Sequence, residues 1–395
     1  MKVVAVCEDR FRDYLLEIFR RHPESGMKIV CFGSWRMGED RNRSYSGTPV
    51  VPISKVSNSI EYDNVLMAGL NTGYLSHMMT AVQEAGLENV LAVRWFDIVN
   101  RTDFMDVHGY RKEHVVKMPE GEEKPCLGEL QVHVTDSCNL NCKACSHFTP
   151  FVHGRHPMDA GIFEKDLENL SRLFSNIYVF HLMGGEPLLE PELCMDMVRL
   201  VKNYFPECSL NIITNGTLIG HMKSGFWECI RDNGITVRVS VYPAVVNNVD
   251  YIKEVLTDNG IPFLCEISNK IEFDKYMSLT YETDPVENSF RCHGRGCYSL
   301  ANGKVTKCPG SIYIRYAADE LSKYGVSGDW LYAKDAINLE EETDGWQIIK
   351  KLMEPCDLCS RCDISNLKKI PWMPVEKDLN LGDWFLDFSN LKIRR

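Results

Sequence analysis

The sequence predicts an α/β protein built on parallel sheets, and two observations support this fold class. In roughly the first hundred residues, short apolar runs at 2–6, 28–32 and 64–68 alternate with helical patterns, as they do in parallel βαβ units. From about residue 128 onward, further apolar runs each end in a polar or glycine-rich turn. The 395 residues, 44% of them apolar, are enough for two or three domains with sizeable cores.

The N-terminal region, 1–105, is predicted to be a Rossmann-like α/β domain. A helix at 9–19 follows the first strand and another begins at Tyr74. This order resembles that of small Rossmann-like domains in bacterial surface-polysaccharide enzymes. The segment after the first strand reads CEDR at 7–10 instead of a glycine-rich loop, so two acids stand where a phosphate would bind. We therefore expect no dinucleotide there, and docking of a protein, carrier or sugar stays open.

Three cysteines, Cys138, Cys142 and Cys145, lie in one segment, SCNLNCKACSHF, directly after a strand that begins at Glu129. A 4Fe-4S cluster normally takes four thiolates, so a site with three leaves one iron open to a substrate or cofactor. The alternative is a tetrahedral zinc site completed by His147, although zinc sites more often pair two ligand-bearing turns. The spacing therefore favours a cluster with one open iron.

Two turns further along the chain carry residues that suit ligand binding. The apolar run 177–182 leads into the tight turn MGGEP, in which Gly184 and Gly185 allow a backbone to approach closely. The next strand, 209–213, ends in the polar turn TNGT, which contains Asn215. Both turns follow apolar strands.

A strand at 236–242 alternates valines on one face with Arg238, Ser240 and Tyr242 on the other. Ser240 is our candidate for a contact to the ribose or carboxylate of a cofactor. A solvent-facing strand serine is the alternative.

In order and spacing, the three cysteines and the turns that follow resemble the radical S-adenosylmethionine superfamily. The resemblance implies a partial (β/α)6 barrel and a 4Fe-4S cluster whose open iron chelates S-adenosylmethionine. Reductive cleavage of that cofactor gives a 5′-deoxyadenosyl radical, which abstracts a hydrogen atom from a substrate. The implied cofactor contacts are Gly184, Gly185, Glu186, Pro187, Asn215 and Ser240. The family usually has an aromatic residue before the third cysteine, where this chain has Ala144, and Phe148 is the candidate to fill that space.

Six more cysteines lie in roughly the last quarter of the chain: Cys292, Cys297, Cys308, Cys356, Cys359 and Cys362. Asn302-Gly303 is a strong hairpin signal between Cys297 and Cys308, and a hairpin brings its two ends together. The three later cysteines, at intervals of three residues, suit a compact metal-binding knuckle. These patterns predict a four-thiolate iron-sulfur cluster, with a four-cysteine zinc knuckle as the alternative.

This second group resembles the SPASM and twitch extensions that follow the barrel in many radical S-adenosylmethionine enzymes. The resemblance implies an auxiliary 4Fe-4S cluster on Cys297, Cys308, Cys359 and Cys362. Cys292 and Cys356 are then substitutes, or ligands of a second, incomplete cluster.

Two outcomes of hydrogen abstraction stay open at this point. An auxiliary cluster that carries off an electron would give a dehydrogenation, whereas a thiol that quenches the substrate radical would give an epimerisation. Some radical epimerases of the family return a hydrogen atom from a cysteine, and Cys265 in the run IPFLCEI is the candidate for that role. Plain core packing of Cys265 is the alternative.

Composition and charge disfavour several classes of partner. The net charge of −11 argues against nucleic acid, whose phosphates require a basic patch. The sequence has no apolar run near about 18 residues and no secretory signal pattern, so we expect no membrane span. Sixteen cysteines together with oxygen-sensitive clusters fit a reducing cytoplasm. The resemblance adds a reductant such as flavodoxin or ferredoxin as a partner.

The sequence thus predicts a radical S-adenosylmethionine oxidoreductase or epimerase. The first choice of substrate is a carbohydrate or nucleotide-linked sugar in polysaccharide biosynthesis, by analogy with the N-terminal domain. A peptide or protein substrate is the second choice, and a non-catalytic iron-sulfur binding or assembly protein is the third. The predicted organisation is a Rossmann-like domain at 1–105, a linker at 106–127, a barrel core at 128–285, an auxiliary-cluster region at 286–370 and a C-terminal tail at 371–395.

Overall fold

The computed structural model describes residues 1–7, 12–21, 23, 26–35, 43–68, 78, 81–93, 115–117, 124–266, 271–292, 298–375 and 378–392. The chain divides into two compact units. The first consists of Met1–Gly128 with Asp344–Lys350, and the second of Glu129–Thr343 with Lys351–Arg395. The second unit therefore contains nearly all of the predicted barrel core and most of the predicted auxiliary region, of which 344–350 belong to the first unit.

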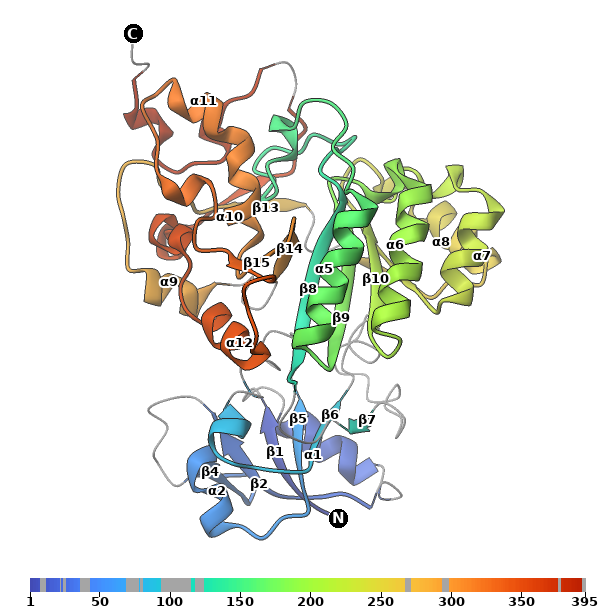
Figure 1. Ribbon diagram of the computed structural model, residues 1–395, viewed down its shortest axis with the longest axis vertical. Helices are drawn as coiled ribbons and strands as arrows, with labels where there is room; N and C mark the ends of the chain where they lie inside the picture. The colour runs from blue at the N-terminus through green and yellow to red at the C-terminus, as the bar shows by residue number, and fades with distance from the viewer. Residues whose placement is uncertain are drawn as a thin grey trace. The chain divides into compact units, whose positions relative to one another are not determined.

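The first unit is a mixed α/β structure around one largely parallel sheet (Figure 1). Its strands are β1 (Lys2–Cys7), β2 (Lys28–Ser34), β3 (Arg43–Tyr45), β4 (Thr48–Pro52), β5 (Asn64–Ala68), β6 (Val90–Val93) and β7 (Val115–Lys117), and its helices include α1 (Arg12–Arg21) and α2 (Ile53–Ser59). Among the described residues the strand order is β3-β4-β2-β1-β5-β6-β7, with antiparallel edges at β3 and β7. β1 pairs in parallel with β2 and β5, which confirms the predicted parallel α/β arrangement.

Several N-terminal predictions lie outside the described residues. They are the acids of the CEDR segment, most of the helix predicted from Tyr74, and the larger part of the predicted linker at 106–127. The described part of that linker forms β7 and the first residues of the next strand. The Rossmann-like label for this unit stays a prediction.

The second unit also contains a largely parallel sheet. Its strands are β8 (Cys126–Thr135), β9 (Asn176–Gly184), β10 (Ser209–Thr214), β11 (Thr236–Ser240), β12 (Phe263–Glu266), β14 (Ser299–Ala301), β15 (Lys304–Thr306) and β16 (Ile337–Asn338), in the order β12-β11-β10-β9-β8-β14-β15-β16. β9, β10, β11 and β12 pair in parallel with their neighbours. Because parallel strands point the same way, the segments after them meet at one edge of the sheet. The partial (β/α)6 barrel stays a prediction.

Helices connect these strands and cover the sheet. They are α5 (Ala160–Leu173), α6 (Pro191–Tyr204), α7 (Ser224–Asp232) and α8 (Val249–Asp258). Further along the chain are α9 (Pro285–Arg291), α10 (Pro309–Tyr313) and α11 (Ala318–Ser322), and then α12 (Gly345–Met353), most of which belongs to the first unit. Figure 1 shows α5, α6, α7 and α8 side by side along the sheet, and α6 contacts both α5 and α7. α5 begins where the Asp159 carboxylate accepts the backbone N–H groups of Gly161 and Ile162 at 2.8 and 3.0 Å.

The C-terminal part of the chain adds strands to the same sheet. The predicted hairpin at Asn302-Gly303 is confirmed, because β14 and β15 pair antiparallel and both turn residues have positive φ (48° and 77°). β14 in turn pairs in parallel with β8, and Gln131 Nε2 donates to Ser299 Oγ at 2.7 Å. A separate two-stranded antiparallel sheet joins β13 (Glu272–Lys275) to β17 (Lys368–Pro371).

Residues of the predicted C-terminal tail belong to a hydrophobic core. Trp384 and Phe385 are buried with Phe148 and Phe151, and the Trp384 and Phe151 rings meet edge to face with centroids 4.8 Å apart. Their large apolar surface explains the burial, because aromatic side chains dominate the energetics of such cores. The tail therefore contributes to this core through Trp384 and Phe385.

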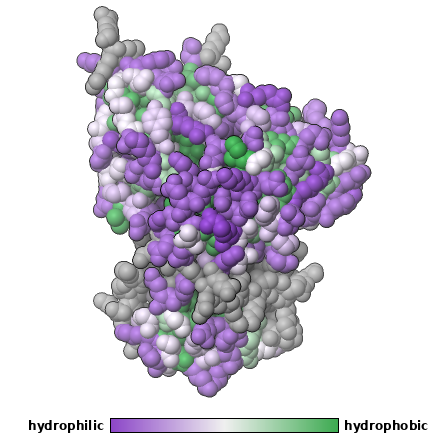
Figure 2. All heavy atoms as spheres, viewed as in Figure 1, coloured by the Kyte–Doolittle hydropathy of each residue, from purple (hydrophilic) through white to green (hydrophobic). Residues whose placement is uncertain are grey.

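On the face drawn in Figure 2, hydrophilic residues predominate and apolar ones are scattered. Within the part of the chain that the structure describes, no helix is long and apolar enough to cross a membrane.

Candidate functional site

A cavity of about 270 Å³ lies in the second unit where the strands end. Cys138, Cys142 and Cys145 line it, so the structure brings the three predicted cluster ligands together. They lie on the loop between β8 and the short 3₁₀ helix η5 (Thr149–Phe151). Asn141, Ala144 and Phe148 in and beside this loop have left-handed backbone conformations (φ 47–53°), which are uncommon without glycine. The turns they form allow one short loop to present three thiols to one space.

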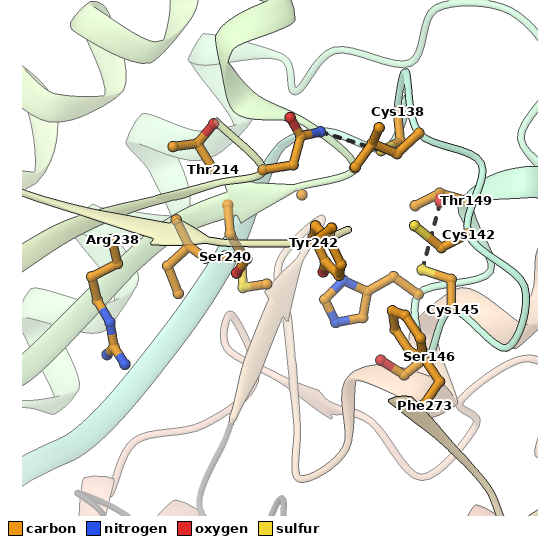
Figure 3. Close-up of a pocket in the computed structure, with 17 residues that line it drawn as sticks. Cys138, Cys142, Cys145, Ser146, Thr149, Thr214, Arg238, Ser240, Tyr242 and Phe273 are labelled. Atoms are coloured by element: carbon orange, nitrogen blue, oxygen red, sulfur yellow. Dashed lines mark hydrogen bonds between the residues drawn. The ribbon is translucent and has the colours of Figure 1, made fainter. Parts of the chain in front are cut away.

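Each of the three sulfurs has a hydrogen-bond donor nearby, and the three donors come from different elements. Asn215 Nδ2 lies 4.0 Å from Cys138 Sγ, Trp372 Nε1 lies 3.0 Å from Cys142 Sγ, and Thr149 Oγ1 lies 3.5 Å from Cys145 Sγ. Figure 3 shows the last of these contacts. Donors aimed at sulfur suit thiolates, which accept hydrogen bonds far better than thiols do.

Burial raises the pKa of the Cys138 thiol to about 11 and that of Cys142 to about 12. The nearness of Cys145 adds to both shifts. Without a cation these groups remain thiols at neutral pH, whereas a bound metal deprotonates its thiol ligands. The buried Cys142 and the partly buried Cys138 and Cys145 would therefore bind as thiolates only with a positively charged metal centre beside them.

The Gly-Gly-Glu-Pro turn after β9 packs directly on the cysteine loop. A Cβ on Gly184 would lie 2.2 Å from the Thr135 carbonyl oxygen, and one on Gly185 would lie 2.1 Å from the Ser137 carbonyl oxygen. Gly185 N donates to Thr135 O at 2.9 Å. We expected the glycines to allow approach of a ligand, and both do line the cavity. Their tightest neighbours, however, are backbone atoms at the start of the cysteine loop.

Glu186 is fully buried and lies outside the cavity lining, as does Pro187. Its carboxylate accepts hydrogen bonds from Thr214 Oγ1 at 2.7 Å and from the backbone N–H groups of Asn215 and Leu188 at 2.8 and 3.1 Å. Burial raises the pKa of Glu186 to about 7, although these hydrogen bonds oppose the shift. The carboxylate thus joins two predicted cofactor turns, while its direct contact with a cofactor stays a prediction.

The inward face of β11 follows the predicted alternation. Arg238, Ser240 and Tyr242 line the cavity, and in Figure 3 Arg238 lies at the far end from Cys142 and Cys145. Asn215 lines it as well. The candidates Ser240 and Asn215 are therefore at the cavity, and their contacts with a cofactor stay predictions.

Cys265 lies on the other face of the sheet. It pairs with Val239 of the neighbouring strand. A Cβ on Gly216 would approach both Val239 Cγ1 and the Ile252 side chain of α8, so Val239 is on the side of that helix. Burial raises the pKa of the Cys265 thiol, whereas the charge of Lys253, also in α8, acts to lower it. Cys265 is absent from the described lining of the cavity. The geometry therefore does not support a hydrogen-donor role, because strand alternation turns this side chain toward the helices.

Phe148 does not fill the space that Ala144 leaves open. Its ring is fully buried in the aromatic core against Phe151 and Phe385. The aromatic rings at the cavity are Tyr242 and Phe273, which are stacked with centroids 5.9 Å apart. No local pattern in the sequence predicts Phe273 at this site, because β13, which carries it, lies far along the chain from the cysteine loop.

A second cavity, of about 390 Å³, gathers the later cysteines. Its lining includes Cys292, Cys308, Cys356, Cys359 and Cys362, whereas Cys297 lies outside the described residues. Cys356 Sγ and Cys359 Sγ are 3.4 Å apart. Among the described residues, the three cysteines of the first cavity included, no group of three or more His, Cys, Asp or Glu side chains is placed to hold a single metal ion.

The two cavities are neighbours. Ser146, His147 and Phe273 line both of them. The second cavity also receives Lys307, a buried lysine whose ammonium donates to Ser289 Oγ and, at 2.9 Å, to the Glu354 carbonyl. Sequence reasoning located both cysteine groups but missed this shared wall.

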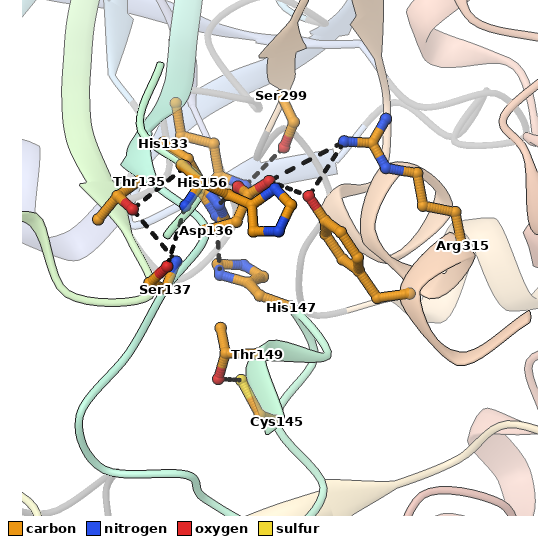
Figure 4. A network of polar contacts seen from close by, with 12 residues as sticks. His133, Thr135, Asp136, Ser137, Cys145, His147, Thr149, His156, Ser299 and Arg315 are labelled. Atoms are coloured by element: carbon orange, nitrogen blue, oxygen red, sulfur yellow. Dashed lines mark hydrogen bonds and ion pairs between the residues drawn. The ribbon is translucent and has the colours of Figure 1, made fainter. Parts of the chain in front are cut away.

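Polar residues behind the cysteine loop form a network with His147, which we had weighed as a zinc ligand (Figure 4). His147 Nδ1 lies 3.2 Å from His133 Nε2, and His133 Nδ1 lies 2.6 Å from Asp136 Oδ1. Tyr316 also donates to the Asp136 carboxylate. Burial alone would raise the pKa of Asp136, but the hydrogen bonds from His133 and Tyr316 lower it overall. His147 Nδ1 is thus hydrogen-bonded within this network.

Residues 127–245, which include the loop with Cys138, Cys142 and Cys145, match the family model described as "4Fe-4S single cluster domain". This matched segment, less than a third of the chain, is similar to the cluster-binding part of radical S-adenosylmethionine proteins.

Similar proteins match part of the chain. GTP 3′,8-cyclase of Campylobacter curvus (strain 525.92) is 28% identical over 106 residues, which is 27% of this chain and 31% of that protein. The FeMo cofactor biosynthesis protein NifB of Chlorobaculum tepidum is 31% identical over 99 residues, 22% of this chain and 23% of that one. This chain therefore spans less than a third of either relative. The crystal structure of BtrN in complex with AdoMet and 2-DOIA has 17% identity and a TM-score of 0.39, covering 61% of this chain and 94% of that one.

Proposed function

We propose that this protein is a radical S-adenosylmethionine dehydrogenase that acts on a carbohydrate or nucleotide-linked sugar. The observation that carries the proposal is the shared wall of Ser146, His147 and Phe273 between two cysteine-lined cavities. A substrate at this wall has a hydrogen-abstracting group on one side and an electron acceptor on the other.

The first cavity fits the cofactors of the superfamily. Cys138, Cys142 and Cys145 would hold the cluster, and Gly184 and Gly185 bring backbone to the cavity beside them. When bound there, a 4Fe-4S cluster with one open iron supplies the electron that cleaves S-adenosylmethionine to a 5′-deoxyadenosyl radical. A reductant such as flavodoxin or ferredoxin is the proposed electron source.

The second cavity favours dehydrogenation over epimerisation. Cys308, Cys356, Cys359 and Cys362, with Cys292 beside them, offer enough thiols for a complete auxiliary 4Fe-4S cluster. Dehydrogenation of a CH–OH group to a carbonyl requires the loss of one hydrogen atom, one proton and one electron, so an acceptor beside the substrate is needed. Epimerisation requires instead a thiol hydrogen donor, and Cys265, the candidate for it, faces α8.

The charge of the first cavity supports an anionic ligand. Its described lining contains the Arg238 guanidinium and no carboxylate. A guanidinium recognises phosphate and carboxylate groups through paired N–H donors. A nucleotide-linked sugar carries such phosphates, which supports this substrate class over a neutral one.

The test is 5′-deoxyadenosine release by anaerobically reconstituted protein with dithionite and S-adenosylmethionine, in the presence of nucleotide-linked sugars or of peptides. Dehydrogenation predicts a product lighter by two hydrogen atoms, formed in equal amount with 5′-deoxyadenosine. Cys142→Ala serves as the inactive control and Cys265→Ser as the matched cysteine change that retains turnover.

Other outcomes select other functions. A product that has the substrate's mass in ordinary water and is one mass unit heavier when the reaction runs in heavy water would mean epimerisation. Stimulation by peptides alone would assign a peptide or protein substrate. No release above the Cys142→Ala control, despite a full iron count, would leave a non-catalytic iron-sulfur protein.

A further inference from the structure

The segment after the auxiliary cysteines folds back onto the loop that holds the first three. Lys143 N donates to Met373 O at 2.9 Å, and Val375 N donates to Asn141 O at 2.8 Å. Between these two bonds, Cys142 forms an isolated β-bridge with Pro374. Backbone hydrogen bonds to the C-terminal segment therefore lie on either side of Cys142 in the cysteine loop.

Trp372 lies at the start of this attachment and contacts the sulfur itself. Its indole Nε1 lies 3.0 Å from Cys142 Sγ, the shortest of the three donor–sulfur contacts described above. The indole N–H is only a donor, so the sulfur must act as the acceptor. A thiolate bound to iron is a much better acceptor than a thiol, so this contact is suited to the metal-bound form.

The side chain is held in place by its neighbours. Trp372 N donates to Ile271 O at 2.8 Å, and its ring lies 6.4 Å from that of Tyr242, which lines the cavity. The donor is thus positioned by β13, β17 and the cavity wall before any cluster binds.

We propose that Trp372 is a positioning residue that raises the reduction potential of the cluster held by Cys138, Cys142 and Cys145. This inference rests on the cluster described under Proposed function. Reduction adds one negative charge to the cluster and its thiolates, so a hydrogen bond to sulfur is stronger in the reduced state and favours it. Because Trp372 follows the auxiliary cysteines in sequence, correct folding of the auxiliary region is also needed to set this potential.

The test compares Trp372→Phe with Trp384→Phe in reconstituted protein. Trp384 is the matched control, because its indole donates to the backbone oxygen of Cys145 at 3.0 Å and not to a sulfur. A potentiometric titration follows the paramagnetic signal that Cys142→Ala abolishes. At a fixed potential we expect the ratio of reduced to oxidised cluster in Trp372→Phe to fall about threefold to tenfold, a tenfold change being ~59 mV for a one-electron couple, and that in Trp384→Phe to change less.

A second measurement requires no stable Trp372 variant. Protein labelled with ¹⁵N at the indole nitrogens should show a ¹⁵N coupling to the reduced cluster by pulsed electron paramagnetic resonance, and the coupling should persist in Trp384→Phe. Equal potentials of the two variants, or absence of this coupling, would overturn the role of Trp372. Wild-type protein that binds no iron and gives no signal would instead overturn the proposed function itself.

Discussion

The buried carboxylate of Glu186 accepts the backbone N–H of Asn215 at 2.8 Å. Through this bond, and a second one from Thr214, the turn after β9 is held against the turn after β10. Because both turns border the first cavity, the shape of that cavity depends on an acid that does not line it.

The buried state of Glu186 predicts a pH dependence of stability. Its pKa rises from an ordinary value of 4.5 to about 7 in the folded state. The folded protein thus keeps a proton that the unfolded chain releases, so the free energy of unfolding is highest below pH 4.5 and falls as the pH rises through 7. We expect a fall of about 2–3 kcal/mol from this group in apo-protein, measured by urea denaturation at several pH values. Asp166, whose pKa burial raises to about 6, acts in the same direction.

Glu186→Gln should flatten this pH profile, because glutamine does not titrate. It should also lower the free energy of unfolding by about 1–3 kcal/mol, because the new amide N–H₂ faces the Asn215 donor. Glu228→Gln, a change at an exposed position, is the matched control and should leave the profile unchanged. A profile that stays equally steep in Glu186→Gln would show that other groups cause it.

The contact between Gly185 and the cysteine loop predicts a steric effect. Gly185→Ala places a Cβ 2.1 Å from Ser137 O and forces the loop to move. We expect loss of most of the iron bound at the first site and destabilisation of about 2–4 kcal/mol. Gly225→Ala in α7 is the control, since nothing lies within 4 Å of its new Cβ. A normal iron content in Gly185→Ala would contradict this reading.

The second cavity predicts which cysteines carry iron. Cys308→Ala and Cys359→Ala should each remove about four irons per chain, whereas Cys265→Ser, which lies on the helix-facing side of β12, should remove none. Iron and sulfide analysis of reconstituted protein measures this directly. Parallel analysis of Cys297→Ser and Cys356→Ser identifies the remaining ligand, and retention of all iron in Cys359→Ala would refute the auxiliary cluster.

Arg238 at the far end of the first cavity predicts a binding effect. Arg238→Gln should weaken binding of a phosphate-bearing substrate by about tenfold or more, because a guanidinium–phosphate pair is lost. Arg199→Gln, on the exposed side of α6, should have no effect. Substrate KM and kcat, determined separately for both variants, distinguish an effect on binding from one on chemistry. Unchanged KM in Arg238→Gln would exclude this role.

The sequence by itself determined the parts of the site that depend on neighbours along the chain. The spacing of Cys138, Cys142 and Cys145, the polar turns that end β9 and β10, and the Asn302-Gly303 hairpin are all local patterns. Turn chemistry and strand alternation act over a few residues, so these elements could be predicted without knowledge of the fold.

Only the tertiary structure decided which side chains meet across long separations. Alternation gives a strand two faces but does not say which one borders the cavity, and so Ser240 faces it while Cys265 faces α8. Glu186 turned toward the backbone of β10 because a buried carboxylate requires donors, and the nearest ones belong to another strand. Trp372 reaches Cys142 across 230 residues of chain. Such contacts depend on how sheets and returning segments pack, which no local pattern encodes.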